Sequence, residues 1–267
     1  MYKLGFIGCG NMGKAMIGGI IASGQLKAEE IIVSDLNEAA LTLAHEELAI
    51  HTTTDSVALA KDSAIIVVAV KPNIYGIVLD QIKEVITSST IIVTIAAGIR
   101  IDFVENILGL DQKIIRTMPN TPALVNEGMT AMCPNKNISE EEKTMVLNLL
   151  SGFGKTEIVG EYLIDAVIGV SGSAPAYVFM FIEAMADAAV LAGMPRKQAY
   201  TFAAQAVYGS AKMVIETGLH PGELKDMVCS PGGTTIEAVK MFEKTGFRAS
   251  VIDSMGVCIE KSKEMSK

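Results

Sequence analysis

Apolar residues follow one pattern in the first part of the chain and a different pattern in the second. Up to about residue 160, short runs of successive apolar residues alternate with segments in which apolar residues recur at helical spacing. Runs without polar alternation are typical of parallel strands that are covered on both faces. The pattern predicts strands at Leu4–Ile7, Ile31–Val33, Ala64–Val70, Thr90–Ile95 and Lys113–Met118, and helices near 12–23, 37–48, 73–86 and 101–108. This order favours a doubly wound α/β sheet, so we expect a Rossmann-like domain over residues 1–160.

The strand patterns stop after about Glu161, and residues 161–267 are expected to form an all-helical domain. Gly- and Pro-containing breaks divide this part into predicted helices at 161–170, 174–192, 195–217, 222–228, 232–244 and 247–264. The second of these helices carries Ala and Met on more than one face, and such a helix must be covered by neighbours. Half of all residues are hydrophobic and the mean hydropathy is +0.39. We therefore expect the helical domain to bury its surplus apolar surface in a subunit interface.

Charge and composition exclude several classes of function. A net charge of −8 argues against a nucleic-acid partner, which requires a basic face. The longest uncharged apolar stretch, Ala166–Ile182, is interrupted by glycines and Pro175, and this indicates a buried helix with its cap and no membrane span. The first residues lack the pattern of a secretory leader, and the four cysteines form no CxxC pair. These features predict a cytoplasmic protein without a metal site or disulfide framework.

A glycine-rich turn follows the first predicted strand. Gly8, Gly10 and Gly13 match G-x-G-x-x-G between a strand and an apolar-periodic helix. In this context Gly8 allows the tight turn, Gly10 allows close approach of a pyrophosphate, and Gly13 lets the helix pack on the strand. The helix N-terminus adds amide donors and a favourable dipole. The pattern predicts a dinucleotide site.

Asp35 ends the second predicted strand, at the spacing where an acidic side chain hydrogen-bonds a ribose 2′-hydroxyl. This favours NADH, although Ser34 and Asn37 could bind the 2′-phosphate of NADPH. The alternative is that Asp35 only caps the helix that begins near Asn37. Both cofactors, NADPH and NADH, stay open at this point.

Three later strand ends carry small residues and prolines that could form the floor beneath a nicotinamide ring. They are Ala69-Val70-Lys71-Pro72, Ala96-Ala97-Gly98 and Met118-Pro119-Asn120-Thr121-Pro122. Ligands of such sheets bind beyond the carboxyl ends of the strands. Lys71 is either a solvated loop lysine or a residue that contacts cofactor or substrate.

The segment Ser230–Thr235 precedes a predicted helix and contains Gly232 and Gly233. Two glycines before a helix start, with Thr234 and Thr235 beside free amides, make a small anion nest that suits a carboxylate. The alternative is an ordinary helix–helix connection.

The long helix Ala174–Ala192 offers no strong base. Dehydrogenases that oxidise an alcohol commonly use His or Lys for this purpose, and neither residue type occurs between Lys155 and Arg196. The absence counts against a β-hydroxyacid dehydrogenase. Reduction of a protonated C=N bond fits better, because an iminium accepts hydride without further activation.

Several blocks of the sequence resemble pyrroline-5-carboxylate reductases, and together they extend from residue 4 to about 263. The matching segments are GFIGCGNMG, AVKP, AAG, IIRTMPNTPALVNEG, GVSGSAPAYVFMFIEAMADAA and HPGELKDMVCSPGGTTIEA. The resemblance implies NAD(P)H-dependent reduction of 1-pyrroline-5-carboxylate to L-proline, the last step of proline biosynthesis. It also implies homodimers formed through the helical domain and assembled into larger rings.

The resemblance implies a role for particular residues. The implied cofactor-binding residues are Gly8, Cys9, Gly10, Asn11, Met12, Gly13, Ser34, Asp35, Ser56, Ala69, Val70, Lys71, Pro72, Ala96, Ala97 and Gly98. The implied substrate-binding residues are Glu161, Ser230, Gly232, Gly233, Thr234 and Thr235, with Thr235 and Lys71 as the catalytic candidates. Other interpretations are a reductase of another cyclic imine and a non-enzymatic dinucleotide sensor, which would not need the Gly232–Thr235 nest.

Overall fold

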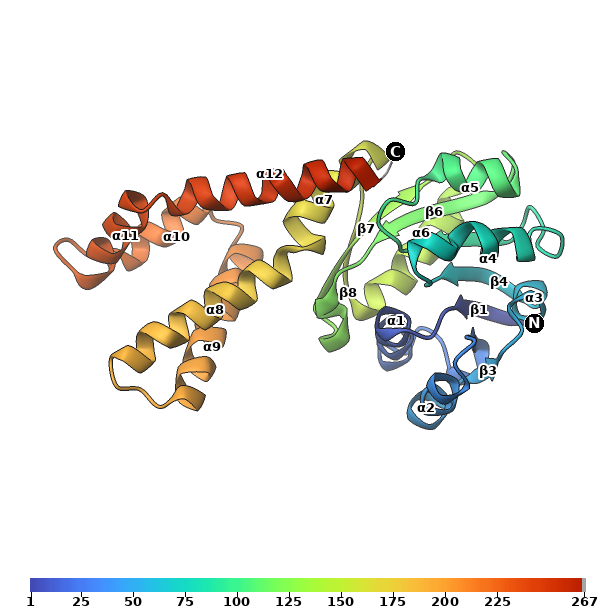
Figure 1. The fold of residues 1–267 in the computed structure, drawn as a ribbon, viewed down its shortest axis with the longest axis horizontal. Coiled ribbons are helices and arrows are strands. Elements are labelled where there is room, and N and C mark those ends of the chain that lie inside the picture. Colours follow the sequence, from blue (N-terminus) through green and yellow to red (C-terminus); the bar gives the residue numbers. More distant parts are fainter. Residues whose placement is uncertain (266–267) are drawn as a thin grey trace. The chain divides into compact units, whose positions relative to one another are not determined.

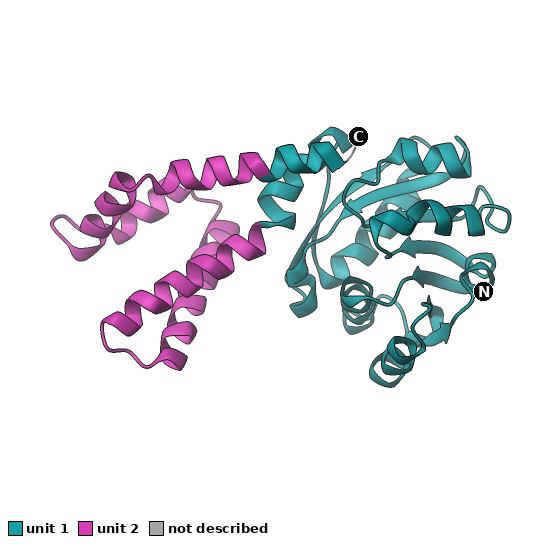
Figure 2. Cartoon of the chain, in the orientation of Figure 1, with its two compact units in different colours: residues 1–173, 258–267 teal, residues 174–257 magenta. Residues whose placement is uncertain are grey.

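The computed structural model describes residues 1–265 and contains two compact units (Figures 1 and 2). Unit 1 comprises Met1–Ser173 together with the C-terminal residues from Cys258, and unit 2 comprises Ala174–Val257.

Unit 1 is built on an eight-stranded sheet in the order β3-β2-β1-β4-β5-β6-β7-β8. The strands are β1 Tyr2–Ile7, β2 Ile31–Ser34, β3 His51–Thr53, β4 Ser63–Val68, β5 Ile91–Thr94, β6 Lys113–Met118, β7 Gly128–Pro134 and β8 Gly154–Ile158. Every neighbouring pair is parallel except β6 and β7. The winding direction changes between β1 and β4, and the carboxyl ends of strands at such a point form the usual ligand crevice.

Side chains that alternate along the strands build a core on each face of the sheet. Ile65 and Val67 of β4 belong to one core, and Ile66 and Val68 belong to the other. The first core is covered by α1 Asn11–Ala22, α2 Glu38–Leu48 and α6 Glu140–Leu150. The second is covered by α3 Ser56–Lys61, α4 Tyr75–Ile82 and α5 Ile101–Leu108. The predicted doubly wound sheet is therefore confirmed.

Three strands were not predicted from the pattern of apolar residues, each for a local reason. β3 is only three residues long and carries His51 and two threonines. β8 lies at the sheet edge and exposes Lys155 and Glu157, as edge strands commonly do. β7 begins at Gly128 and ends at Pro134, residues that disfavour strands, and its pairing to β6 holds it in place. Two helices, α3 and α6, were also not predicted.

Unit 2 is entirely helical, as predicted. Its elements are α8 Ala174–Leu191, α9 Arg196–Thr217, α10 Pro221–Val228, α11 Thr234–Lys244 and the first part of α12 Phe247–Met265. α8 packs against α9. The ring of Phe247 packs against those of Phe242 and Phe181, with centroid distances of 5.0 and 6.1 Å. Few side chains of unit 2 are buried within the chain, among them Ala186, Ala199 and Ala203.

The segment between β8 and α8 belongs to unit 1. It comprises η5 Glu161–Leu163, α7 Ile164–Val167 and the π-helical turn η6 Ile168–Gly172. Ile164 and Ile168 pack with Ala131 and Cys133 of β7, so the compact units divide at Ser173 and not at the predicted domain boundary of 160/161. The last turns of α12 also return to unit 1, where the Ser262 hydroxyl donates to the Asp165 carboxylate at 2.6 Å. Residues 266–267 of the predicted second domain lie outside the described residues.

Candidate functional site

The glycine-rich turn joins β1 to α1 in a conformation that requires glycine. Gly8 has φ +108°, and a Cβ there would lie 2.5 Å from the carbonyl oxygen of Ala69. A Cβ on Gly13 would lie 2.8 Å from the carbonyl oxygen of Gly8. Gly10, by contrast, has no heavy atom within 4 Å of such a Cβ, and as the N-cap of α1 it provides no capping side chain. No side chain therefore caps the first amides of α1, and an uncapped helix start of this kind suits an anion.

A cavity of about 530 Å³ opens beside this turn at the ends of β1, β2 and β4. It is lined by Ile7, Gly8, Gly10, Ser34, Asp35, Leu36, Ser56, Ala69, Val70, Lys71, Ile74, Ile77, Val78 and Gln81. The hydroxyls of Ser34 and Ser56 are hydrogen-bonded to each other at 3.0 Å. This cavity joins the residues predicted to bind the adenosine ribose to the glycine-rich turn.

Asp35 is held by two backbone amides. Its Oδ2 accepts a hydrogen bond from the Cys9 amide at 2.7 Å, and its Oδ1 accepts one from the Asn37 amide at 2.9 Å. Asn37 itself caps α2 by accepting from the Ala40 amide at 3.2 Å. The alternative that Asp35 caps this helix is thus wrong. Asp35 ties the glycine-rich turn to the end of β2 and still lines the cavity.

A second cavity, of about 420 Å³, continues from the first at the ends of β4, β5 and β6. Its lining residues are Gly10, Asn11, Met12, Ala69, Val70, Lys71, Pro72, Ile95, Ala96, Ala97, Met118, Pro119, Asn120, Thr121 and Gly172. Because the two cavities share Gly10, Ala69, Val70 and Lys71, they form one cleft along the carboxyl edge of the sheet. Within residues 1–265, Lys71 makes no ion pair, so its ammonium is free to meet a ligand.

Asn120 belongs to the predicted floor segment Met118–Pro122 and does line the cleft, whereas Gly172 is a lining residue that was not predicted. The Asn120 Oδ1 accepts from the Met129 amide at 2.8 Å, and its Nδ2 donates to the Ser171 carbonyl at 3.2 Å. Nothing in the local sequence marks Gly172 as a residue of the cleft.

Three of the residues predicted to bind cofactor do not line this cleft. Cys9 is 3% exposed, and its contribution is the amide held by Asp35. Gly13 packs beneath the turn. Gly98 has φ +81°, and a Cβ there would lie 2.9 Å from the Met265 carbonyl oxygen. It lines a neighbouring cavity of about 770 Å³ and shapes the turn that follows Ala97.

Tyr75 joins two of the strand ends that form the cleft. Its hydroxyl donates to the Val68 carbonyl at the end of β4 and accepts from the Ile95 amide after β5. The ring is fully buried, and burial raises the pKa of this phenol. Tyr75 therefore stays neutral and links the ends of β4 and β5 through these two hydrogen bonds.

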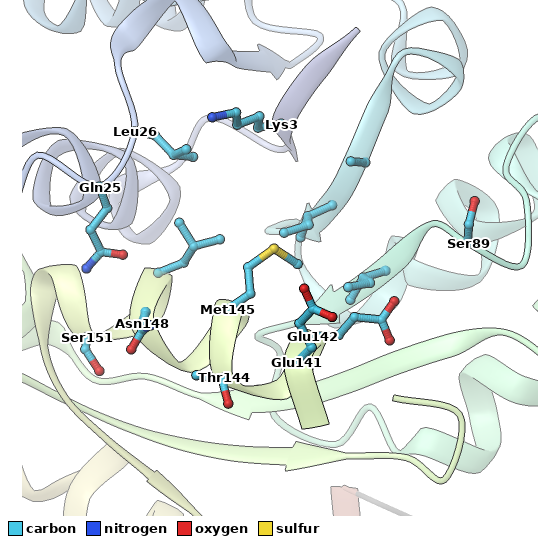
Figure 3. A pocket seen from close by; sticks show the side chains of 14 residues that line it. Lys3, Gln25, Leu26, Ser89, Glu141, Glu142, Thr144, Met145, Asn148 and Ser151 are labelled. Atoms are coloured by element: carbon cyan, nitrogen blue, oxygen red, sulfur yellow. The ribbon is translucent and has the colours of Figure 1, made fainter. Parts of the chain in front are cut away.

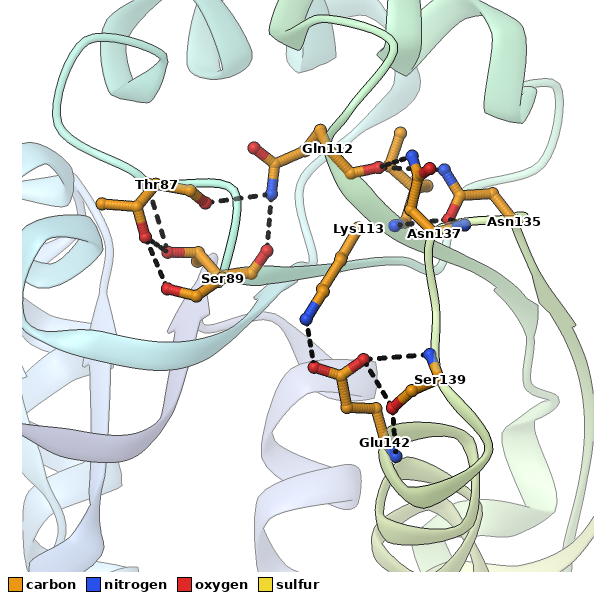
Figure 4. A network of polar contacts seen from close by, with 10 residues as sticks. Thr87, Ser89, Gln112, Lys113, Asn135, Asn137, Ser139 and Glu142 are labelled. Atoms are coloured by element: carbon orange, nitrogen blue, oxygen red, sulfur yellow. Dashed lines mark hydrogen bonds and ion pairs between the residues drawn. The ribbon is translucent and has the colours of Figure 1, made fainter.

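A larger cavity, of about 1030 Å³, lies at the opposite edge of the sheet. Figure 3 shows Lys3, Gln25 and Met145 around it, and it contains none of the predicted site residues. The same edge carries the ion pair between Lys113 and Glu142, with Ser139 bonded to the same carboxylate (Figure 4). Since ligands bind at the carboxyl ends of parallel strands, we do not assign this amino-end cavity to the cofactor.

The predicted carboxylate loop lies in unit 2. Gly232 has φ +68°, and the Gly233 amide donates to the Ser230 carbonyl at 3.0 Å, which closes the turn. Gly233 is the N-cap of α11 and provides no capping side chain, so the amides of Thr234 and Thr235 begin the helix uncapped. The geometry of a small anion nest is present in unit 2, whereas Lys71 belongs to unit 1.

Glu161 is the one predicted substrate residue that lies in unit 1. Its Oε1 accepts from Arg116 Nη1 at 2.8 Å and from the Ile101 amide at 2.9 Å. Both partners belong to the protein itself, so the structure gives this carboxylate a role within the fold.

Cys9 and Cys133 are buried free thiols. Burial raises the pKa of the Cys9 thiol and raises that of Cys133 to about 11, so both thiols are protonated near neutral pH. Among residues 1–265, no group of three or more His, Cys, Asp or Glu side chains is placed to hold a metal ion.

Comparison with known proteins identifies both parts of the chain. Residues 3–98 match the family model "NADP oxidoreductase coenzyme F420-dependent", and residues 161–265 match "Pyrroline-5-carboxylate reductase dimerisation". The pyrroline-5-carboxylate reductase of Escherichia coli (strain K12) is 56% identical over 99% of this chain and 98% of its own length.

Two solved structures extend the comparison to three dimensions. A pyrroline-5-carboxylate reductase from Coxiella burnetii superposes with a TM-score of 0.93 at 32% identity, over 100% of this chain and 99% of its own. The Plasmodium falciparum pyrroline carboxylate reductase, solved with NADP bound, gives 0.90 at 34% identity over 100% and 98%. With full-length relatives at this level of identity and solved structures of the same fold, the chain belongs to the pyrroline-5-carboxylate reductase family.

Proposed function

We propose that the cleft of unit 1 holds NAD(P)H and that the chain uses it to reduce the C=N bond of 1-pyrroline-5-carboxylate to L-proline. As a member of its family the chain is an NAD(P)H-dependent oxidoreductase of proline biosynthesis. The observation that carries the proposal is the turn from Gly8 to Gly13, where two glycines are required by close backbone contacts and the third leaves the start of α1 open.

The residues present fit a dinucleotide from end to end. The amides that begin α1 suit the pyrophosphate, because an uncapped helix start attracts negative charge. Ser34, Ser56 and Asp35 lie where an adenosine ribose would be bound. The small residues Ala96 and Ala97 would lie against a flat ring in the second cavity. When bound, the reduced nicotinamide supplies a hydride to the imine carbon.

Residues of unit 2 supply the substrate end of the reaction. We propose that the amides of Thr234 and Thr235 bind the substrate carboxylate. Gly233, whose own amide donates to the Ser230 carbonyl, would shape this loop together with Ser230 and Gly232. A carboxylate held there also counterbalances the positive charge of the iminium. The Thr235 hydroxyl would hydrogen-bond the ring nitrogen of the substrate, and Lys71 would contact the cofactor. Positioning of this kind supplies most of the rate when the reacting groups need little proton transfer.

The helical region supports a proposal about assembly. The stretch Glu161–Leu191 is long and apolar enough to span a membrane by length and composition, yet only 6% of its most apolar window is buried inside the chain. Because the dimerisation model covers these residues, we propose that a second copy covers them, in a homodimer that assembles into a larger ring. We also propose that the dimerisation domain begins at residue 161, and that the protein is cytoplasmic and contacts neither membrane nor nucleic acid.

The test is oxidation of NADH and NADPH in parallel, followed by absorbance, with 1-pyrroline-5-carboxylate as substrate. The matched control is 1-pyrroline, which has the same C=N bond but no carboxylate. Rapid turnover of the acid and slow turnover of the control support both the reaction and the carboxylate nest. Folded protein that binds cofactor but turns over neither compound would favour another cyclic imine or the sensor interpretation.

A further inference from the structure

Glu161 connects segments that are far apart in the sequence. It begins η5, and its Oε1 receives Arg116 Nη1 from β6 at 2.8 Å and the Ile101 amide at the start of α5 at 2.9 Å. The Arg116 side chain is 4% exposed and that of Glu161 is 25% exposed. Among residues 1–265, Glu161 is the only carboxylate paired with this guanidinium.

Each of the three connected segments leads directly to a wall of the nicotinamide-side cavity, the 420 Å³ part of the cleft. Arg116 stands two residues before the lining residue Met118, and Ile101 follows the lining residues Ala96 and Ala97. The helical segment that starts at Glu161 ends at Gly172, which also lines the cavity.

The walls are also packed against one another. Ala97 and Met118 both pack on the cluster that includes Ile164 and Ile168, which lie just after Glu161. Asn120 fastens the far end of the same segment by donating to the Ser171 carbonyl at 3.2 Å. The segment from Glu161 to Gly172 is thus held at its start by the ion pair with Arg116 and near its end by the hydrogen bond from Asn120.

We propose that Glu161 is a positioning residue: its carboxylate, paired with Arg116, sets the spacing of the three segments that wall the nicotinamide-side cavity. A buried ion pair contributes little net stability, but it fixes one geometry strongly because either partner alone is costly. A shift of a few tenths of an ångström in these walls changes how a flat ring lies relative to a substrate, and reaction rates are sensitive to such shifts. This inference rests on the proposed cofactor site, and it assigns Glu161 an effect on rate without direct substrate contact.

The test is Glu161→Gln, which keeps an acceptor for the Ile101 amide but removes the charge that faces Arg116. We expect kcat to fall about 10-fold or more, with KM for the imine changed less than about 2-fold. A raised KM with unchanged kcat would show that Glu161 contacts the substrate, and unchanged values of both would show that the pair has only a structural role. Either result overturns the proposal.

The chain offers a matched control on the same strand. Lys113 at the start of β6 pairs with Glu142, and these side chains are 25% and 20% exposed. Glu142→Gln breaks a comparable pair at the amino edge of the sheet, far from the cleft along the carboxyl edge. We expect it to lower the melting temperature while kcat stays within about 2-fold of the wild type. An equal loss of kcat in both variants would mean that general destabilisation, and not positioning, explains the effect.

One further readout keeps the inference distinct from the proposed reaction. The fluorescence of bound NADH, recorded without any imine, reports the surroundings of the nicotinamide. We expect Glu161→Gln to change this emission while the dissociation constant of NADH changes less than about 3-fold, because the residues at the pyrophosphate end are unchanged.

If Glu161→Gln does not fold, the double variant Arg116→Met/Glu161→Met removes both charges. It should fold and keep a low kcat, and recovery of wild-type kcat would overturn the proposal. A wild-type protein inactive on the imine but with normal NADH emission would instead refute the proposed substrate.

Discussion

The carboxylate of Asp35, at the end of β2, accepts a hydrogen bond from the backbone amide of Cys9 in the glycine-rich turn at 2.7 Å. This bond holds a negative charge at the rim of the cavity that suits the adenosine ribose. A second bond, from the Asn37 amide, prevents the carboxylate from turning away.

The first prediction is that Asp35 selects against the 2′-phosphate, so the protein binds NADH more tightly than NADPH. Repulsion between two nearby negative charges near a protein surface is worth on the order of a few kcal/mol. Asp35→Asn keeps an acceptor and removes the charge, and it should shift the ratio of the two dissociation constants toward NADPH by about 10-fold or more, which corresponds to about 1.4 kcal/mol. Fluorescence titration measures both constants without substrate. A ratio that stays the same in the variant would contradict this role.

The second prediction separates folding from cofactor binding within the glycine-rich turn. Gly10 has an extended backbone with φ −76°, and a Cβ there meets no protein atom within 4 Å. Gly10→Ala should therefore keep the melting temperature while weakening NADH binding by about 10-fold or more, because the methyl group enters the space of the pyrophosphate. Gly18→Ala, on the same helix with only an ordinary 3.7 Å contact, serves as the control. It should bind normally and gain about 0.5–1 kcal/mol of stability.

The third prediction concerns the hydroxyl of Tyr75. Tyr75→Phe leaves the buried Ile95 amide without its partner, which costs about 1–3 kcal/mol. Because the hydroxyl joins the ends of β4 and β5, we also expect weaker cofactor binding. Chemical denaturation and NADH titration measure the two effects. Tyr162→Phe, at a residue that is 85% exposed, is the control and should change neither quantity. A Tyr75→Phe protein as stable as the wild type would show that the hydroxyl does not link the two strands.

The fourth prediction tests the carboxylate nest and distinguishes an enzyme from a sensor. A Cβ on Gly233 would lie 2.3 Å from Ser230 Oγ, so Gly233→Val must disturb the loop. We expect turnover of 1-pyrroline-5-carboxylate to fall by about 100-fold or more with near-normal NADH binding. Unchanged turnover would exclude the nest from the substrate site.

The fifth prediction addresses the second copy. Phe179 on α8 is 64% exposed in the single chain, which is unusual for so large an apolar side chain. Phe179→Glu should weaken or abolish the dimer in sedimentation experiments, because a charge would be buried in the interface. Leu110→Glu is the control, since Leu110 is also 64% exposed but lies in unit 1. A dimer that survives Phe179→Glu would place the interface elsewhere.

The pattern of apolar residues, glycines and prolines was sufficient to predict those strands and helices that are stabilised mainly by residues close along the chain. The parallel strands could be predicted because strands covered on both faces are apolar on successive residues, as in Ile65–Val68. The boundaries of α9 and α10 followed from Pro195, Gly218 and Pro221, which end or begin helices whatever their surroundings. The edge strands β3 and β8 carry no such signal, since only pairing with a neighbouring strand stabilises them.

The sequence by itself thus determined the doubly wound sheet, the helical second part and the glycine-rich turn, because each depends on residues that are close along the chain. Tertiary structure alone decided what the charged side chains do. Asp35 meets Cys9 across 26 positions, and Glu161 meets Arg116 across 45. Which group pairs with a carboxylate depends on the strand ends and helix starts that the fold brings together. That arrangement cannot be predicted from residues close along a single sequence.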